Sequence, residues 1–216
     1  MKAISLLNIV PIAVGLGACT NVGAPREPRP ASESLAADPP AFATIRSLSW
    51  AGSGCPAGTV AGNLAPDLTA FTLLFDSYVA EIGPGLPLSL SRRNCQILVD
   101  LDSPQGWSYS VFDFDYRGFA NIPSGVSGIL ESKYFFQGQS YTARLATTLR
   151  GPRNGDYQIR DSLPLDAVVW SPCGAQRGLL INVAVRLENH SGNSNARGSI
   201  TLVTPVYGLQ WRRCVL

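Results

Sequence analysis

The sequence predicts an all-β fold, a jelly-roll-like β-sandwich of two antiparallel sheets. Apolar and polar residues alternate at period two in many short segments, which is typical of strands with one buried face. The chain is rich in Gly (21) and Pro (16), which favours tight turns. No window of a dozen residues has a convincing helical period, so no helices are available to connect parallel strands. Two stacked sheets bury the apolar faces.

The alternating segments define the expected strands. They are residues 44–50, 68–75, 95–101, 107–119, 128–136, 141–149, 156–161, 167–170, 179–188 and 199–211. Within residues 107–119 the alternation places Phe112, Phe114 and Tyr116 on one face and Asp113 with Asp115 on the other.

Three regions follow from composition. Residues 1–18 have the pattern of a secretory signal peptide, because one lysine precedes an apolar run that is too short and too broken to span a bilayer. Residues 19–41 are rich in Pro, Ala and Ser and are expected to form a disordered tether. Residues 42–216 are expected to form the β-sandwich domain.

The end of the signal peptide allows two outcomes. Leu16-Gly17-Ala18-Cys19 resembles a bacterial lipobox, which predicts lipidation of Cys19 and a cell-surface lipoprotein. Cleavage after Thr20 would instead remove this cysteine and release a secreted, extracellular protein. Contact with a membrane is therefore expected only through a lipid on Cys19.

Four cysteines lie in the domain: Cys55, Cys95, Cys173 and Cys214. An even number in an exported chain predicts two disulfides, with three possible connectivities. We favour Cys55–Cys95 and Cys173–Cys214, each closing a loop of about 40 residues. A zinc site is disfavoured because the cysteines form no CxxC pair and the chain has one histidine, His190.

Several motifs together resemble one known family. They are Gly54-Cys55-Pro56-Ala57-Gly58-Thr59, Ile82-Gly83-Pro84-Gly85, Arg92-Arg93-Asn94-Cys95-Gln96, Pro104-Gln105-Gly106, Tyr116-Arg117-Gly118-Phe119-Ala120, Trp170-Ser171-Pro172-Cys173-Gly174 and Gln210-Trp211-Arg212-Arg213-Cys214. Their order and spacing are similar to the small secreted proteins of fungi and bacteria grouped as domain of unknown function 4360. The resemblance implies secretion and the four cysteines, and it assigns no activity to any residue.

Composition and motifs exclude several function classes. The net charge of +2 and the 15% charged residues give no surface for nucleic acid, and we expect no nucleic-acid partner. The sequence contains no GxSxG or HExxH motif, so common hydrolase signatures are missing. No cofactor motif is present, and we expect no cofactor.

The remaining candidate sites are weak patterns. Asp100, Asp102, Asp113 and Asp115 form two Asp-x-Asp pairs that would bind Ca²⁺ only if their strands were neighbours; a solvated acidic face is the simpler interpretation.

Among the aromatic residues, Trp107 and Tyr109 are candidates for stacking on a glycan, although most aromatic residues of a β-sandwich belong to the core. Asn189 begins an Asn-His-Ser sequon and is a candidate glycosylation site.

These observations leave three hypotheses of function. The first is a secreted or surface-anchored, non-enzymatic protein that binds a cell-wall glycan or a protein partner. The second is a secreted carbohydrate-active hydrolase, which requires two carboxyl groups about 5–9 Å apart in a groove. The third is a structural protein of the cell envelope. The sequence predicts no oligomeric state.

Overall fold

The computed structural model describes residues 38–140, 142–173 and 175–214. These residues form twelve strands and two 3-10 helices. The strands are β1 (Thr44–Ala51), β2 (Val60–Leu64), β3 (Ala70–Phe75), β4 (Val79–Ile82), β5 (Arg92–Asp102), β6 (Trp107–Ile122), β7 (Val126–Phe136), β8 (Ala143–Arg150), β9 (Arg153–Ser162), β10 (Leu179–Asn189), β11 (Gly198–Thr201) and β12 (Thr204–Arg213). The helices are η1 (Leu88–Ser91) and η2 (Leu165–Ala167).

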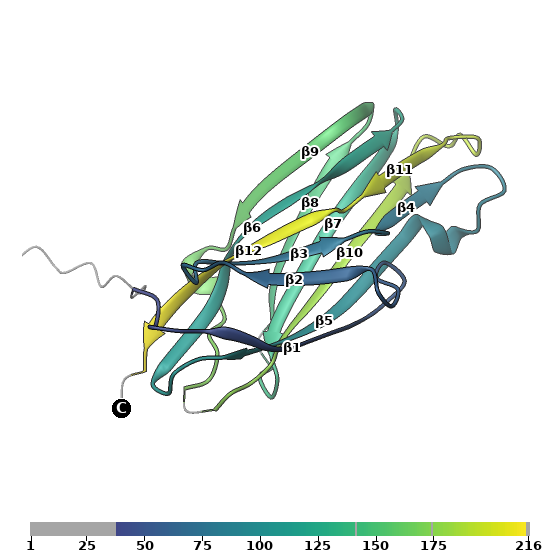
Figure 1. Ribbon diagram of the computed structural model, residues 1–216. Helices are drawn as coiled ribbons and strands as arrows, with labels where there is room; N and C mark the ends of the chain where they lie inside the picture. The colour runs from purple at the N-terminus through teal and green to yellow at the C-terminus, as the bar shows by residue number, and fades with distance from the viewer. Residues whose placement is uncertain (1–37, 141, 174, 215–216) are drawn as a thin grey trace, which may run out of the picture. The chain divides into compact units, whose positions relative to one another are not determined.

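The strands form two antiparallel sheets, as the sequence predicts (Figure 1). One sheet has five strands in the order β1-β5-β10-β7-β8. The other has seven strands in the order β2-β3-β12-β6-β11-β4, with β9 paired to the free side of β6. The long strand β6 therefore pairs with β12 and β11 on one side and with β9 on the other.

Most expected strands are confirmed. The expected strand over residues 199–211 is divided into β11 and β12, and three further differences have local causes. The sequence analysis missed β2 and β4, which are short and lie beside glycine or proline turns. Residues 167–170 are not a strand, because η2 occupies their start and only one isolated bridge, Ser110 to Trp170, joins their end to β6.

A register shift in β6 corrects the expected position of Phe112. Leu209 of β12 faces Val111, but the next residue, Gly208, faces Asp113, so Phe112 is an extra residue between two regular segments. A Cβ on Gly208 would lie 2.8 Å from Asp113 Cβ and 3.3 Å from the Phe112 ring. Phe112 thus lies beside Gly208 and apart from the buried Phe114.

Hydrogen bonds from two tyrosines join the sheets across the core. The hydroxyl of Tyr78, which precedes β4, donates to the Val183 carbonyl of β10 at 2.6 Å. The Tyr134 hydroxyl of β7 donates to the Val111 carbonyl of β6. Both rings are almost fully buried, so each bond satisfies a polar group that water cannot reach.

The predicted disulfides, Cys55–Cys95 and Cys173–Cys214, are confirmed. The predicted signal peptide and Cys19 lie outside the described residues. Within the described ranges, no helix is both long and apolar enough to cross a lipid bilayer.

Replacing Tyr78 by Phe should destabilise the protein. The substitution removes the hydroxyl that satisfies the buried Val183 carbonyl, and we expect a loss of about 1–3 kcal/mol in the free energy of unfolding. Tyr109→Phe is the matched control, because the buried Tyr109 hydroxyl has no hydrogen-bond partner among the described residues. Urea denaturation measures both variants; equal losses would contradict the assigned bond.

Candidate functional site

A shallow groove lies on the outer face of the seven-stranded sheet, where β6, β9 and the junction of β11 with β12 meet. Its volume is about 540 Å³. The groove, called here the Phe119 groove, is lined by Arg117, Gly118, Phe119, Asp156, Tyr157, Gln158, Val203 and Thr204. In Figure 1 the strands that form it, β9, β6 and β12, lie side by side.

Phe119 presents its ring on this outer face. The inward residues of this part of β6 are the buried Tyr116 and Ala120, which leaves the side chain of Phe119 40% exposed. The Thr201 hydroxyl accepts a hydrogen bond from the Phe119 N–H at 2.8 Å and donates one to its carbonyl at 3.2 Å. The backbone that carries the ring is therefore held on both sides.

Gly118 makes room for a tyrosine beneath the groove. The Tyr157 hydroxyl of β9 donates to the Thr201 carbonyl at 2.5 Å. A Cβ on Gly118 would lie 2.0 Å from that carbonyl oxygen and 2.8 Å from the Tyr157 hydroxyl. Any residue other than glycine at position 118 would block this close contact. The hydrogen bond from Tyr157 also fixes Thr201, whose hydroxyl holds the backbone of Phe119.

A change of register opens the groove next to Phe119. Thr204 of β12 faces Arg117, whereas Ser199 of β11 faces Asn121, so one extra residue separates the two pairings. Val203 lies at this point, 46% exposed, and its N–H donates to the Arg117 carbonyl. Two apolar side chains, Phe119 and Val203, are thus exposed at the groove, where the neighbouring outward-facing residues of β6 are polar.

The Asp115 carboxylate orders the polar side chains beside the groove. Arg117 donates from Nε and Nη2 to its two oxygens at 3.2 and 3.1 Å. Gln158 Nε2 and Arg160 Nε donate to Oδ2 at 2.7 and 3.3 Å. The hydrogen bonds from Arg117 lower the pKa of the Asp115 carboxyl, and those from Gln158 and Arg160 add to the effect. Three planar donor groups are therefore fixed by one carboxylate.

The model of one protein family matches residues 42–214. The chain belongs to the family called domain of unknown function (DUF4360). A relative described as an uncharacterized secreted protein of the fungus Arthroderma benhamiae is 42% identical over 176 residues, which are 79% of this chain and 71% of the relative. The resemblance expected from the cysteine motifs is confirmed.

Two solved structures show distant similarity to this DUF4360 protein. One is TmCBM61 in complex with β-1,4-galactotriose, at 11% identity and a TM-score of 0.30 over 78% of this chain and 90% of the other. The second is the enzymatically active domain of tailspike protein 4 of bacteriophage CBA120, at 15% identity and a TM-score of 0.27 over 73% and 19%. At these scores neither similarity carries an argument about ligand or activity.

The expected aromatic platform of Trp107 and Tyr109 is not an open surface. Tyr109 is 5% exposed and its ring packs between Phe136 and Trp211, with ring centroids 5.1 and 5.5 Å away. Tyr109 is therefore a core residue. Trp107 is half-buried, and the Arg213 guanidinium lies 4.2 Å above its ring.

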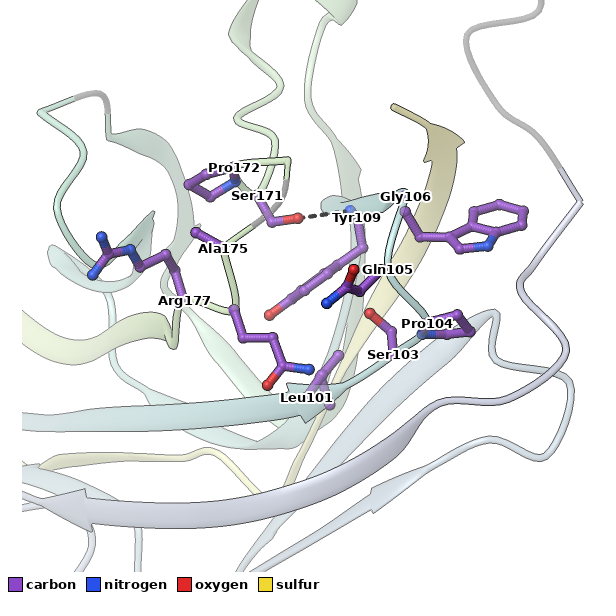
Figure 2. A pocket seen from close by; sticks show the side chains of 12 residues that line it. Leu101, Ser103, Pro104, Gln105, Gly106, Tyr109, Ser171, Pro172, Ala175 and Arg177 are labelled. Atoms are coloured by element: carbon purple, nitrogen blue, oxygen red, sulfur yellow. Dashed lines mark hydrogen bonds between the residues drawn. The ribbon is translucent and has the colours of Figure 1, made fainter. Parts of the chain in front are cut away.

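Figure 2 shows a second, smaller pocket near Tyr109, between the loop 103–106 and residues 171–172 and 175–177. Its volume is about 100 Å³. The Tyr109 ring points toward its floor, and the Tyr109 N–H donates to the Ser171 hydroxyl at 2.9 Å. Because the Tyr109 hydroxyl itself is buried, a ligand in this pocket would not reach it without rearrangement.

The two Asp-x-Asp pairs lie in different sheets, so the strands that carry them are not neighbours and the condition for a Ca²⁺ site is not met. Asp100 and Asp102 belong to β5 of the five-stranded sheet, and Asp113 and Asp115 belong to β6 of the other sheet. Asp100 accepts a hydrogen bond from Ser47, and Asp102 accepts one from Gln176. Across residues 38–140, 142–173 and 175–214, no group of three or more His, Cys, Asp or Glu side chains is arranged to hold a metal.

Asn189 is the last residue of β10 and has an exposed side chain. Its Oδ1 accepts hydrogen bonds from the Ser191 N–H and hydroxyl at 3.0 and 2.6 Å. Glycosylation at Asn189 stays a prediction.

The sequence analysis missed Phe119 as a site residue. One signal was available, because alternation along β6 places an aromatic side chain in phase with Asp115 and Arg117 on the polar face. The neighbouring Val203 had no such signal, since its exposure depends on the register change between β11 and β12.

Asp115→Asn should reduce the acid sensitivity of the protein. Because the folded pKa of Asp115 is lowered, its charge stabilises the fold above the unfolded value of about 3.9 and this contribution disappears as the pH falls below it. We expect the variant to be about 1–2 kcal/mol less stable at pH 7 and closer to wild type at pH 2. Urea denaturation at both pH values measures the difference.

Asp113→Asn is the control for this prediction. Asp113 lies on the same strand, and no ion pair holds its carboxylate within the described part of the chain. An equal pH-dependent effect in both variants would contradict the role given to the Asp115 network.

Proposed function

We propose that the protein is a secreted, non-enzymatic module that binds a neutral glycan in the Phe119 groove. Secretion follows from the relationship to a protein described as secreted. The observation that carries the glycan assignment is the exposed Phe119 ring beside polar side chains that Asp115 holds in place.

The chemistry of the groove suits a sugar ring. A pyranose has an apolar face of C–H groups, which packs against an aromatic ring, and hydroxyls around its edge, which bind planar amide and guanidinium groups. Phe119 supplies the ring, and Arg117 and Gln158 supply the planar groups. Because the Asp115 network already orders these side chains, little conformational entropy is lost when a ligand binds.

The carboxyl groups favour binding over hydrolysis. A glycosidase needs a general acid whose pKa is raised toward neutral pH. Asp115, the carboxyl group that orders the side chains of the groove, has its pKa lowered by hydrogen bonds from Arg117, Gln158 and Arg160. Asp115 therefore stays ionised and is a poor proton donor.

A purely structural role is the remaining alternative. A protein that only packs into an envelope has no need for an exposed aromatic ring fixed beside a preorganised set of hydrogen-bond donors. Phe119 and Val203 line the same groove, and adjacent exposed apolar side chains rimmed by polar groups favour contact with a ligand.

Phe119→Ala should abolish most binding to insoluble neutral polysaccharide. The protein is incubated with cellulose, chitin and β-1,3-glucan, and the bound fraction is measured for the glycan that retains wild type best. Loss of the ring should weaken affinity by about ten-fold, as expected for loss of a central aromatic contact of 1–2 kcal/mol. Phe42→Ala is the matched control, because Phe42 is 52% exposed and does not line the groove.

Two results would overturn the proposal. One is equal binding by wild type and the Phe119 variant, with loss only in the Phe42 variant. The other is steady release of reducing ends from the bound polysaccharide, which would identify the protein as a hydrolase.

A further inference from the structure

We propose that the outer face of the five-stranded sheet is a second binding surface, which binds an acidic polysaccharide. This surface lies on the other sheet from the Phe119 groove and does not depend on it. The cations that form it, called here the basic face, are Arg92, Lys133, Arg144, Arg150 and Arg186.

Sheet register places these five cations on one face. Lys133 of β7 lies directly opposite Arg144 of β8, and Arg186 of β10 lies directly opposite Arg92 of β5. Arg150 extends the surface along β8, where it faces Ser127. Lys133 and Arg186 each lie between two buried residues, and strand register puts Arg92, Arg144 and Arg150 on the same solvent-facing side as these two.

The two like-charge pairs would destabilise an ordinary sheet surface. One carboxylate compensates most of this repulsion: Glu131 contacts Arg144 at 2.7 Å, Lys133 at 2.8 Å and Arg186 at 3.8 Å. Hydrogen bonds from Arg144 and Lys133 lower the pKa of the Glu131 carboxyl to about 2, so it stays charged. Glu131 thus holds Lys133, Arg144 and Arg186 close together, while Arg92 and Arg150 form no ion pair with it in the described residues.

The positive charge is concentrated on this face. Two carboxylates, Glu131 and Glu188, share these rows with the five cations, which leaves an excess of three positive charges there, whereas the whole chain carries +2. Asp100 and Asp102 lie on the same face of β5 but beyond Gln96 and Leu98, outside these rows. An anionic ligand is therefore attracted to one part of the surface.

Neighbouring side chains favour a sugar polymer over other polyanions. Asn94, Gln96 and Asn182 lie on the same face and offer amides that bind hydroxyl groups. The large apolar side chains exposed in the described residues are Phe42, Leu74, Leu86, Leu88, Phe119, Leu165 and Val203, and β5, β7, β8 and β10 contribute none. The apolar side chains on this face, Leu98, Phe135 and Leu180, are each partly buried, so the described part of the face presents no fully exposed aromatic ring for stacking bases.

Strand geometry suits a linear polymer. Adjacent strands are about 4.8 Å apart and outward residues repeat about every 6.6 Å along a strand, so the cations form a shallow two-dimensional grid. An extended chain that carries a carboxylate on each sugar can lie across this grid and meet several cations at once. A single uronate would meet one or two, so we expect affinity to rise with chain length.

Binding to polygalacturonate at low salt tests the proposal. The full secreted protein should bind this polymer, and the double variant K133Q/R144Q should bind about ten-fold more weakly, because two charge-assisted contacts are lost. The control R177Q/R197Q removes the same net charge from exposed loop positions and should bind like wild type. Added salt should weaken wild-type binding because ions screen exposed charges.

A second pair of substitutions guards against misfolding. R92Q/R150Q removes two cations that form no ion pair with Glu131 in the described residues, so it leaves the Glu131 contacts intact and should also weaken binding. Equal losses in R92Q/R150Q and R177Q/R197Q would overturn the proposal, because net charge alone would then explain binding.

Two further binding measurements identify the class of partner. Single-stranded DNA or phosphatidylserine vesicles that bind as tightly as polygalacturonate would overturn the assignment to an acidic polysaccharide. Phe119→Ala should retain polygalacturonate binding, so failure of this proposal and failure of the neutral-glycan site give different results.

Discussion

Hydrogen bonds from tyrosines across the core fix how the two sheets face each other. Tyr78 reaches the Val183 carbonyl and Tyr134 reaches the Val111 carbonyl, so each sheet donates one side chain to the backbone of the other. Apolar packing alone is non-directional and would tolerate some sliding of the sheets. A directional bond that satisfies a buried carbonyl resists such sliding, because a shift of the sheets would leave the carbonyl unpaired. The positions of Phe119 and of Glu131 follow from that arrangement.

The two outer faces of the sandwich differ in chemistry. The seven-stranded sheet presents an aromatic ring and planar donors ordered by Asp115, and the five-stranded sheet presents cations ordered by Glu131. In each case a partly buried carboxylate with a lowered pKa holds longer basic side chains in place. Under the two proposals above, a domain with two such faces would contact two components of a cell wall.

Sequence periodicity predicted most of the fold because one buried face imposes alternation on each strand. The even number of cysteines in the domain predicted two disulfides, and the favoured one of three connectivities is confirmed. The register shifts at Phe112 and Val203 were out of reach, because they depend on how β6 pairs with β12 and β11. The basic face was missed for the same reason: Arg92 and Arg186 are distant in sequence and lie opposite each other only through strand register. Calcium was expected only if β5 and β6 were neighbours, and they are not.

The location of the neutral-glycan site is the claim that most needs measurement. Titration of the ¹⁵N-labelled protein with laminarihexaose or cellohexaose, followed by NMR, maps the binding surface residue by residue. The account predicts the largest shift changes at the backbone amides of Arg117, Phe119, Gln158 and Thr204, with little change in β5, β7 and β8. Changes confined to the pocket beside Tyr109, or spread over the five-stranded sheet, would contradict it.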